Sequence, residues 1–280
     1  MRAAWPAIRN VLRAWALLLG LCAALGALGW WIGGLRVALV FGFGGALVGV
    51  GSYIYSDRIV LGMVGARELL PGEAAPLQTV VEQLSLRARV VKPRLYVIPD
   101  TFPRALSVGR SPGSASIAFS TGLLGVPSPA ELEGILAHEM AHIRNRDVLV
   151  QTTVVVLAGS LVEFSRIGGW LSRALLYVLG PIAASFTHLL LSPRREFEAD
   201  RLAAELCESP HGLADALVRL DQASELVEFQ ASPATEPLYT INPFAEEGLA
   251  KLFVTHPPIA VRVQRLRDLD PGWREKLQAA

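Results

Sequence analysis

The chain has 280 residues, of which 52% are hydrophobic and only 18% are charged, a balance typical of a membrane protein and not of a disordered or disulfide-stabilised chain. Its 26 basic and 25 acidic residues nearly cancel, so the sequence offers no strongly basic surface for nucleic acid. Cys22 stands in an apolar run and Cys207 in a polar segment. We expect no disulfide between them, as in a reducing compartment.

Two uncharged runs begin the chain. Twenty-two residues separate Arg13 from Arg36, and 20 separate Arg36 from Asp57, while a membrane-spanning helix needs about 20. A cleaved signal peptide is the alternative for the first run, but that run is long, no small-residue cleavage site follows it, and a second apolar run starts at once. We predict a hairpin of two membrane helices in residues 1–56, with its turn at residues 33–36.

We predict that the first polar segment, residues 57–147, contains both helices and short strands. The hydrophobic spacing indicates a helix over 76–91 and strands over 94–98 and 116–121, with a loop between them that contains a short strand at 105–108. A strong helix start follows, because Ser128 at the N-cap, Pro129 at the first helical position and Glu131 at the third form a capping box. This helix should run toward Arg146.

A second apolar pair, residues 148–192, follows that helix. Its first run holds 15 uncharged residues, 148–162, and is either a buried helix or part of a span that continues toward Gly169. Its second run, the 20 residues between Arg173 and Arg194, is long enough to cross a bilayer. His188 within it is either an intramembrane functional group or a helix histidine with a local partner. We predict a second membrane hairpin here.

The second polar segment, residues 193–280, predicts helices over 192–207, from His211 and from Pro258, around a turn-rich stretch at 229–257. Arginines concentrate outside the predicted hairpins and not in their turns, which by the positive-inside rule places both termini and both polar segments in the cytoplasm. The two segments can then assemble into one domain. We therefore expect a mainly helical α+β protein with four transmembrane helices in two hairpins.

The segment His138-Glu139-Met140-Ala141-His142 contains candidate metal ligands and a candidate general base. Histidines four residues apart share a helical face and can present two imidazoles to one ion. Zinc suits imidazole ligands and leaves a position for water, and Glu139 can act as the general base for that water. A third ligand is needed, and the carboxylates of residues 196–200 can supply it. The alternative for them is a charged first turn where a membrane helix ends.

Four segments together resemble the HtpX-type membrane zinc endopeptidases, bacterial relatives of the CAAX prenyl endopeptidases. They are SDRIVLGMVGARELLPGEAAPL, STGLLGVPSPAELEGILAHEMAHIRNRD, SPRREFEADRLAAEL and THPPIAVRVQRL. The resemblance implies a zincin-like metalloprotease domain in the bacterial cytoplasmic membrane. It also implies one zinc ion per chain and the cleavage of misfolded or damaged membrane proteins on the cytoplasmic side.

The resemblance also assigns the metal and its base. His138, His142 and Glu196 would be the zinc ligands, and Glu139 would be the general base. A prenyl-protein endopeptidase is the close alternative as an enzyme. From another class, the alternative is a non-catalytic membrane scaffold of the same fold, which an altered HExxH motif or a missing third carboxylate would signal.

Four further residues match the family's motifs. Asp200 would orient a ligand histidine, and Asn145 would help to shape the site. His256 and Arg262 would engage substrate carbonyl groups or the developing oxyanion; the alternatives are a turn histidine and a solvated helix arginine.

One segment departs from the family. Where relatives typically have Asn-Ala-Phe-Ala, this chain has Arg-Ala-Leu-Ser at residues 104–107. That region lies near the substrate edge in relatives, so cleavage preference should differ. We expect a polypeptide substrate to bind extended along an edge strand, assigned to residues 116–121.

Overall fold

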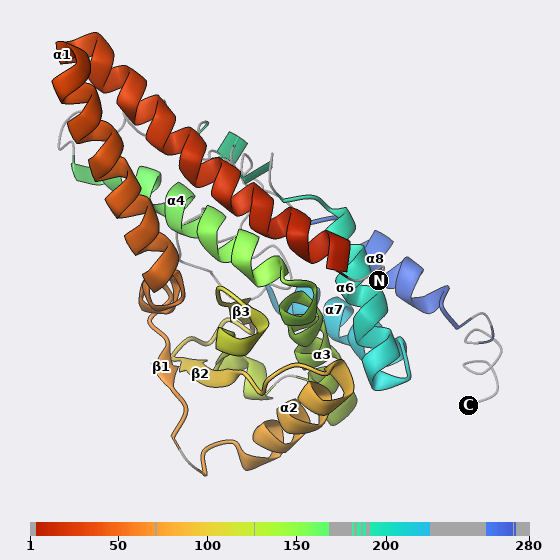
Figure 1. The fold of residues 1–280 in the computed structure, drawn as a ribbon. Coiled ribbons are helices and arrows are strands. Elements are labelled where there is room, and N and C mark those ends of the chain that lie inside the picture. The colour runs from red at the N-terminus through yellow and green to blue at the C-terminus, as the bar shows by residue number, and fades with distance from the viewer. Residues whose placement is uncertain are drawn as a thin grey trace.

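A computed structural model of the protein describes residues 4–70, 72–125, 127–167, 181, 184–185, 187–188, 191–224, 256–270 and 272. Most of the predicted fourth span and of the turn-rich stretch therefore lie outside the described residues. In the described part the chain is mainly helical and contains one four-stranded sheet (Figure 1). The predicted mainly helical α+β class is confirmed.

Helix α1 (Ala4–Met63) is a hairpin of two antiparallel legs (Figure 1). The helix breaks at Gly33 and Gly34, and Gly34 adopts a φ of 70°, which is strained for residues with a side chain. Small residues bring the legs together, because a Cβ atom on Gly29 would lie 2.7 Å from the Val37 carbonyl oxygen. The helical hairpin and its turn are confirmed, but the second leg continues past the predicted boundary at residue 56.

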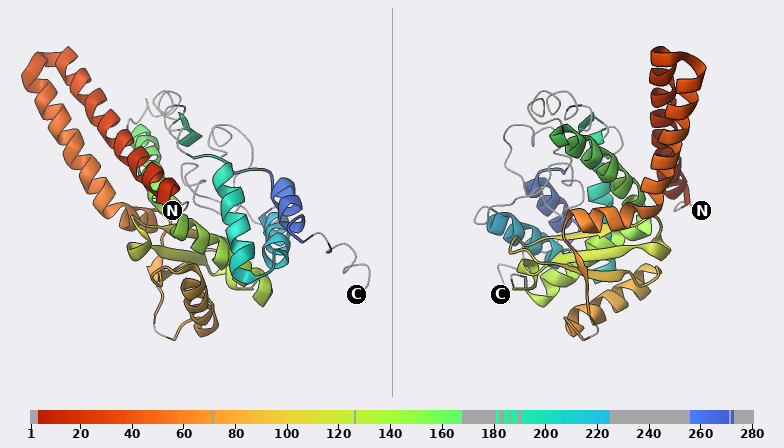
Figure 2. Two further views of the ribbon diagram at one scale, coloured as in Figure 1. Left: turned by 45° about the vertical axis from the view of Figure 1, so that its right-hand side comes forward. Right: turned by 90° about the vertical axis from the view of Figure 1, so that its left-hand side faces the viewer.

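The hairpin carries the apolar surface expected of a membrane segment. Within the described residues, one helical stretch has the length and apolar character of a membrane segment: Cys22–Gly51, which includes the hairpin turn and has a mean hydropathy of 1.7, with only 12% of its most apolar window buried. Trp31 is 83% exposed and Phe43 71% exposed. Figure 2 shows the hairpin projecting away from the sheet and the helices packed on it.

The sheet has the order β1-β2-β4-β3. Strand β2 pairs parallel with β4, and the pairs β1–β2 and β3–β4 are antiparallel. The strands are β1 (Arg67–Glu68), β2 (Arg94–Ile98), β3 (Ala105–Val108) and β4 (Ser116–Ser120); the short helices η1 (Pro112–Ser114) and η2 (Gly122–Gly125) flank β4.

The assignment of residues 116–121 as an edge strand is wrong. These residues form β4, as predicted, but β4 is hydrogen-bonded to β2 on one side and to β3 on the other. An internal strand has no free backbone groups for an added strand. The edge strand that packs against the HExxH helix is β3.

Two helical layers cover the sheet. Helices α2 (Ala75–Ala88) and α3 (Pro129–Asn145) cover one face, and the end of α1 with α4 (Asp147–Ile167) covers the other. Because neighbouring strand residues point to opposite faces, Ala105 joins the first layer while Leu106 packs with Val60 and Val155 in the second. The beginning of α4 is therefore buried in the core, and the helix continues to Ile167, toward Gly169.

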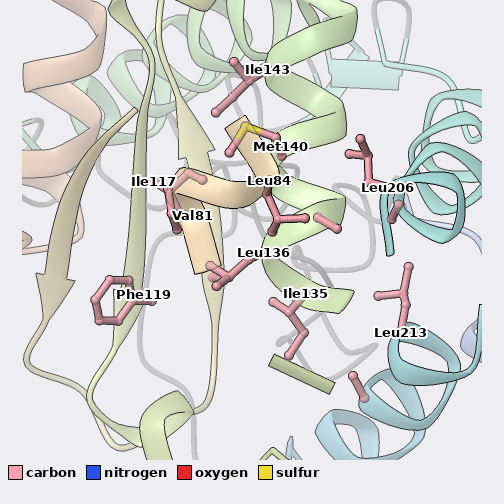
Figure 3. Close-up of a cluster of buried hydrophobic side chains, with 14 of the residues drawn as sticks. Val81, Leu84, Ile117, Phe119, Ile135, Leu136, Met140, Ile143, Leu206 and Leu213 are labelled. Atoms are coloured by element: carbon pink, nitrogen blue, oxygen red, sulfur yellow. The ribbon is translucent and has the colours of Figure 1, made fainter. Parts of the chain in front are cut away.

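Three helices close the domain around α3. They are α6 (Arg194–Cys207), α7 (His211–Ser224) and α8 (Ile259–Arg267). Figure 3 shows Leu136 and Met140 of α3 near Ile117 of the sheet, with Leu206 and Leu213 on the opposite side of the helix. Helix α3 thus lies in the centre of the core, and its HExxH residues are held by packing on several sides.

Candidate active site

The capping box predicted at the start of α3 is confirmed. The Ser128 hydroxyl accepts a hydrogen bond from the Glu131 backbone N–H, and the Ser128 N–H donates to the Glu131 carboxylate. Arg219 of α7 donates to the same carboxylate at 2.9 Å. These contacts fix where α3 begins and therefore which residues face inward ten positions later.

The three predicted metal ligands lie together. The Nε2 atoms of His138 and His142 are 3.2 Å apart. From α6, Glu196 places Oε2 at 3.5 Å from His138 Nε2 and Oε1 at 3.7 Å from His142 Nε2. All three side chains are buried, and one ligand atom from each lies within 4.8 Å of the others. Such a group can hold a metal ion.

Asp200 stands behind His138. It follows Glu196 by one helical turn, and its Oδ1 lies 3.0 Å from His138 Nδ1. Arg262 of α8 donates from Nε and Nη2 to the two oxygens of Asp200, at 2.9 and 2.7 Å. Asp200 thus contacts the ring at the nitrogen opposite the one that faces His142 and Glu196, while Arg262 fixes Asp200.

Asp147 lies behind His142, a contact that the sequence did not predict. Its Oδ2 lies 3.2 Å from His142 Nδ1. Asn145, for which a site-shaping role is predicted, is the last residue of α3 and is half-buried. The sequence shows only that Asp147 follows the HExxH helix directly. Whether its side chain contacts that helix depends on the conformation of the turn between α3 and α4.

The remaining predicted residues converge on the same place. His256 Nδ1 lies 3.2 Å from Glu196 Oε2, and Arg262 Nη1 lies 4.0 Å from the same oxygen. Arg262 has no exposed surface, so its alternative assignment as a solvated arginine is wrong. Glu139 is 1% exposed and follows His138 on α3.

Opposite charges dominate this buried site. Burial by itself would lower the pKa of His142, but the carboxylates of Glu196 and Asp147 raise it to about 10. Burial would likewise raise the pKa of Glu196, yet His256 and His142 hold it well below its ordinary value. For Asp200, Arg262 and His138 overcome burial and lower the pKa to about 2. Glu196 and Asp200 are therefore ionised at neutral pH.

Residues 71–270 of the chain match Peptidase family M48. The chain belongs to this family. A "Protease HtpX homolog" of Pelotomaculum thermopropionicum is 38% identical over 275 residues, which cover 92% of this chain and 98% of the relative. The proteins of the same description from Syntrophobacter fumaroxidans and Pyrococcus abyssi are 39% and 38% identical, over 89% and 92% of this chain and 97% and 95% of their own lengths.

Among solved structures, this M48 peptidase is similar to the chain described as "Crystal Structure of S. mikatae Ste24p". The TM-score is 0.48 and the sequence identity 20%, with coverage of 93% of this chain and 66% of that chain. The resemblance found in the sequence is confirmed by the family match and by the full-length relatives. With its metal-binding cluster and its exposed apolar hairpin, the protein is a membrane-associated metalloprotease.

Proposed function

We propose that this M48 peptidase is a zinc endopeptidase that cleaves misfolded or damaged membrane proteins at the cytoplasmic face of the bacterial cytoplasmic membrane. The spacing of the candidate ligand atoms supports zinc, because they lie 3.2, 3.5 and 3.7 Å from one another. Tetrahedral zinc with bonds of about 2.0–2.1 Å separates its ligand atoms by about 3.3 Å. Two imidazoles and one carboxylate leave a fourth position, as in catalytic zinc sites.

The buried side chains support a hydrolytic mechanism. A bound zinc ion would supply a Lewis acid and lower the pKa of a bound water. Glu139, which directly follows His138, would accept a proton from the attacking water and deliver it to the leaving amine. Asp200 and Asp147 would hold the rings of His138 and His142 so that each Nε2 atom points to the metal.

The other three predicted residues have different roles. Arg262 directs two nitrogens to Asp200, which favours a positioning role over direct contact with a substrate carbonyl. His256 lies beside Glu196 Oε2 and retains the predicted contact with substrate or oxyanion. Asn145, at the end of α3, keeps its predicted role in shaping the site.

A polypeptide substrate would bind as an extended strand along β3. This strand lies at the edge of the sheet and packs against the helix that carries both histidines. The segment that departs from the family pattern, residues 104–107, includes most of β3. We therefore expect the cleavage preference of this protein to differ from that of its relatives.

The membrane arrangement that we propose has four spans, with both polar segments in the cytoplasm. The first hairpin exposes its apolar surface, and arginines are concentrated outside both predicted hairpins. Helix α4 starts next to the end of α3, the helix that carries both histidines, and runs beside α1 (Figure 1). Both ends of the second hairpin would then adjoin the site, since α6 carries Glu196.

Metal analysis of the detergent-purified protein tests this function. We expect one zinc ion per chain, loss of peptide hydrolysis with a chelator, and recovery on addition of zinc. An internally quenched peptide is compared with the same peptide farnesylated on a C-terminal cysteine. Cleavage of the farnesylated peptide alone would instead identify a prenyl-protein endopeptidase, and zinc-loaded protein that cleaves neither peptide would identify a non-catalytic scaffold.

A further inference from the structure

Arg195 is a largely buried arginine beside the predicted metal ligand Glu196. Its side chain is 11% exposed, and its Nη2 atom lies 3.3 Å from Glu196 Oε1. Its Nε and Nη1 atoms are buried and have no hydrogen-bond partner within the described part of the chain. Buried donors without acceptors are rare in folded proteins, because they lose their hydration without replacing it.

The other basic groups around the metal site differ from Arg195. Arg262 has both oxygens of Asp200, and the Nδ1 atoms of His138 and His142 lie beside Asp200 and Asp147. Among the described residues, Arg195 has only Glu196 Oε1, an oxygen of a predicted metal ligand. The Nε and Nη1 groups of Arg195 therefore need an acceptor other than these carboxylates.

We propose that Arg195 binds the substrate: its Nε and Nη1 groups donate hydrogen bonds to main-chain carbonyl oxygens next to the scissile bond. A guanidinium in contact with a ligand carboxylate places whatever it binds close to the metal. Arginine keeps its charge and holds five donors in a rigid plane, so it can bind Glu196 and carbonyl oxygens together. This inference rests on the proposed peptide hydrolysis and adds a residue to it.

Arg195→Lys is the first test. Lysine keeps the positive charge and one contact with Glu196 but removes the planar group that carries Nε and Nη1. We expect full zinc content and a kcat/KM for an internally quenched peptide that is about 10–100-fold lower, as for the loss of hydrogen bonds from a charged donor. Arg194→Lys makes the same chemical change at an exposed neighbour and should leave kcat/KM unchanged.

Single thioamide substitutions in the peptide locate the contact. Sulfur is a weaker acceptor than the carbonyl oxygen, so the wild-type protein should lose activity most at one or two positions beside the scissile bond. Arg195→Lys should lose less at those positions and equally elsewhere, because the two changes remove the same interaction. If the lysine variant folds poorly, Arg195→Ala with added methylguanidinium should recover activity.

Three outcomes would overturn the proposal. Loss of zinc in parallel with activity in Arg195→Lys would mean that Arg195 only holds Glu196. Equal thioamide sensitivity in the variant and the wild type would mean that its donors do not reach the carbonyl groups, and unchanged kcat/KM would mean that they are not used. A failure of the proposed function would differ, because zinc-loaded wild type and Arg194→Lys would then both be inactive.

Discussion

His142 Nδ1 and Asp147 Oδ2 lie 3.2 Å apart, although the two residues belong to different helices. Helix α3 ends at Asn145, and Arg146 adopts a left-handed conformation with a φ of 61°, before α4 begins at Asp147. This one turn residue brings the carboxylate back to the imidazole. This contact therefore links α3, the helix that carries both histidines, to the core helix α4.

Replacement of Asp147 should weaken metal binding. We expect Asp147→Ala to lower zinc affinity by about 10–100-fold, because the His142 ring loses the partner that fixes its tautomer and orientation. Competition with a fluorescent chelator measures this affinity. Asn145→Ala is the matched comparison, and an equal loss in that variant would mean that Asn145 supports the site as much as Asp147 does.

Glu139→Gln should keep zinc and lose peptide hydrolysis. The amide has a similar shape but cannot accept a proton from water, and Glu139 is not one of the three grouped ligands. Zinc content and peptide cleavage are measured on the same preparation. Substantial remaining activity would remove Glu139 from the mechanism.

The three carboxylates of the α6 segment should behave differently. Glu196→Ala should lose most zinc and all activity, and Asp200→Ala should weaken zinc affinity by about 10–100-fold. Glu198 is exposed because it points about 200° away from Glu196 around the helix, so Glu198→Ala should change little. A zinc-replete Glu196→Ala beside a zinc-free Glu198→Ala would reverse the assignment.

Zinc binding should release a proton at pH 7. The pKa of His142, raised to about 10, leaves this ring protonated in the metal-free protein, and a metal ligand must be neutral. Calorimetric titration with zinc in two buffers of different ionisation enthalpy should reveal a release of about one proton. The raised pKa of His142 also stabilises the metal-free fold. This contribution is complete below pH about 6.5 and is lost as the pH rises through about 10. Zinc binding with no proton release would mean that His142 is already neutral.

The first hairpin should place its turn away from the cytoplasm. In a protein whose two cysteines are replaced by serine, Trp31→Cys lies beside the turn and Leu86→Cys lies on the exposed surface of α2. An impermeant thiol reagent added from the cytoplasmic side should label the second and not the first. Equal labelling would place the hairpin outside the bilayer. The same measurement at Gly169, which lies outside the described residues, tests the second hairpin.

Elements whose causes are local can be predicted from the sequence. The capping box of Ser128 and Glu131, the hairpin turn at Gly33 and Gly34, and the strands at 94–98 and 105–108 all follow from contacts or periodicity within a few residues. His138 and His142 share a helical face for the same reason. For Glu196, motif resemblance was also needed, because residues 196–200 offered several carboxylates on one helix.

Which distant groups meet depends on how the helices and strands pack. The apolar pattern of residues 116–120 predicts a strand but not its neighbours, so the internal position of β4 emerged only from pairing with β2 and β3. The charges of Asp147, Arg195 and Arg262 are visible in the sequence, but their burial and partners depend on how α3, α4, α6 and α8 pack. Local sterics act over one or two turns of chain, whereas burial and ion pairing are set by segments far apart in sequence.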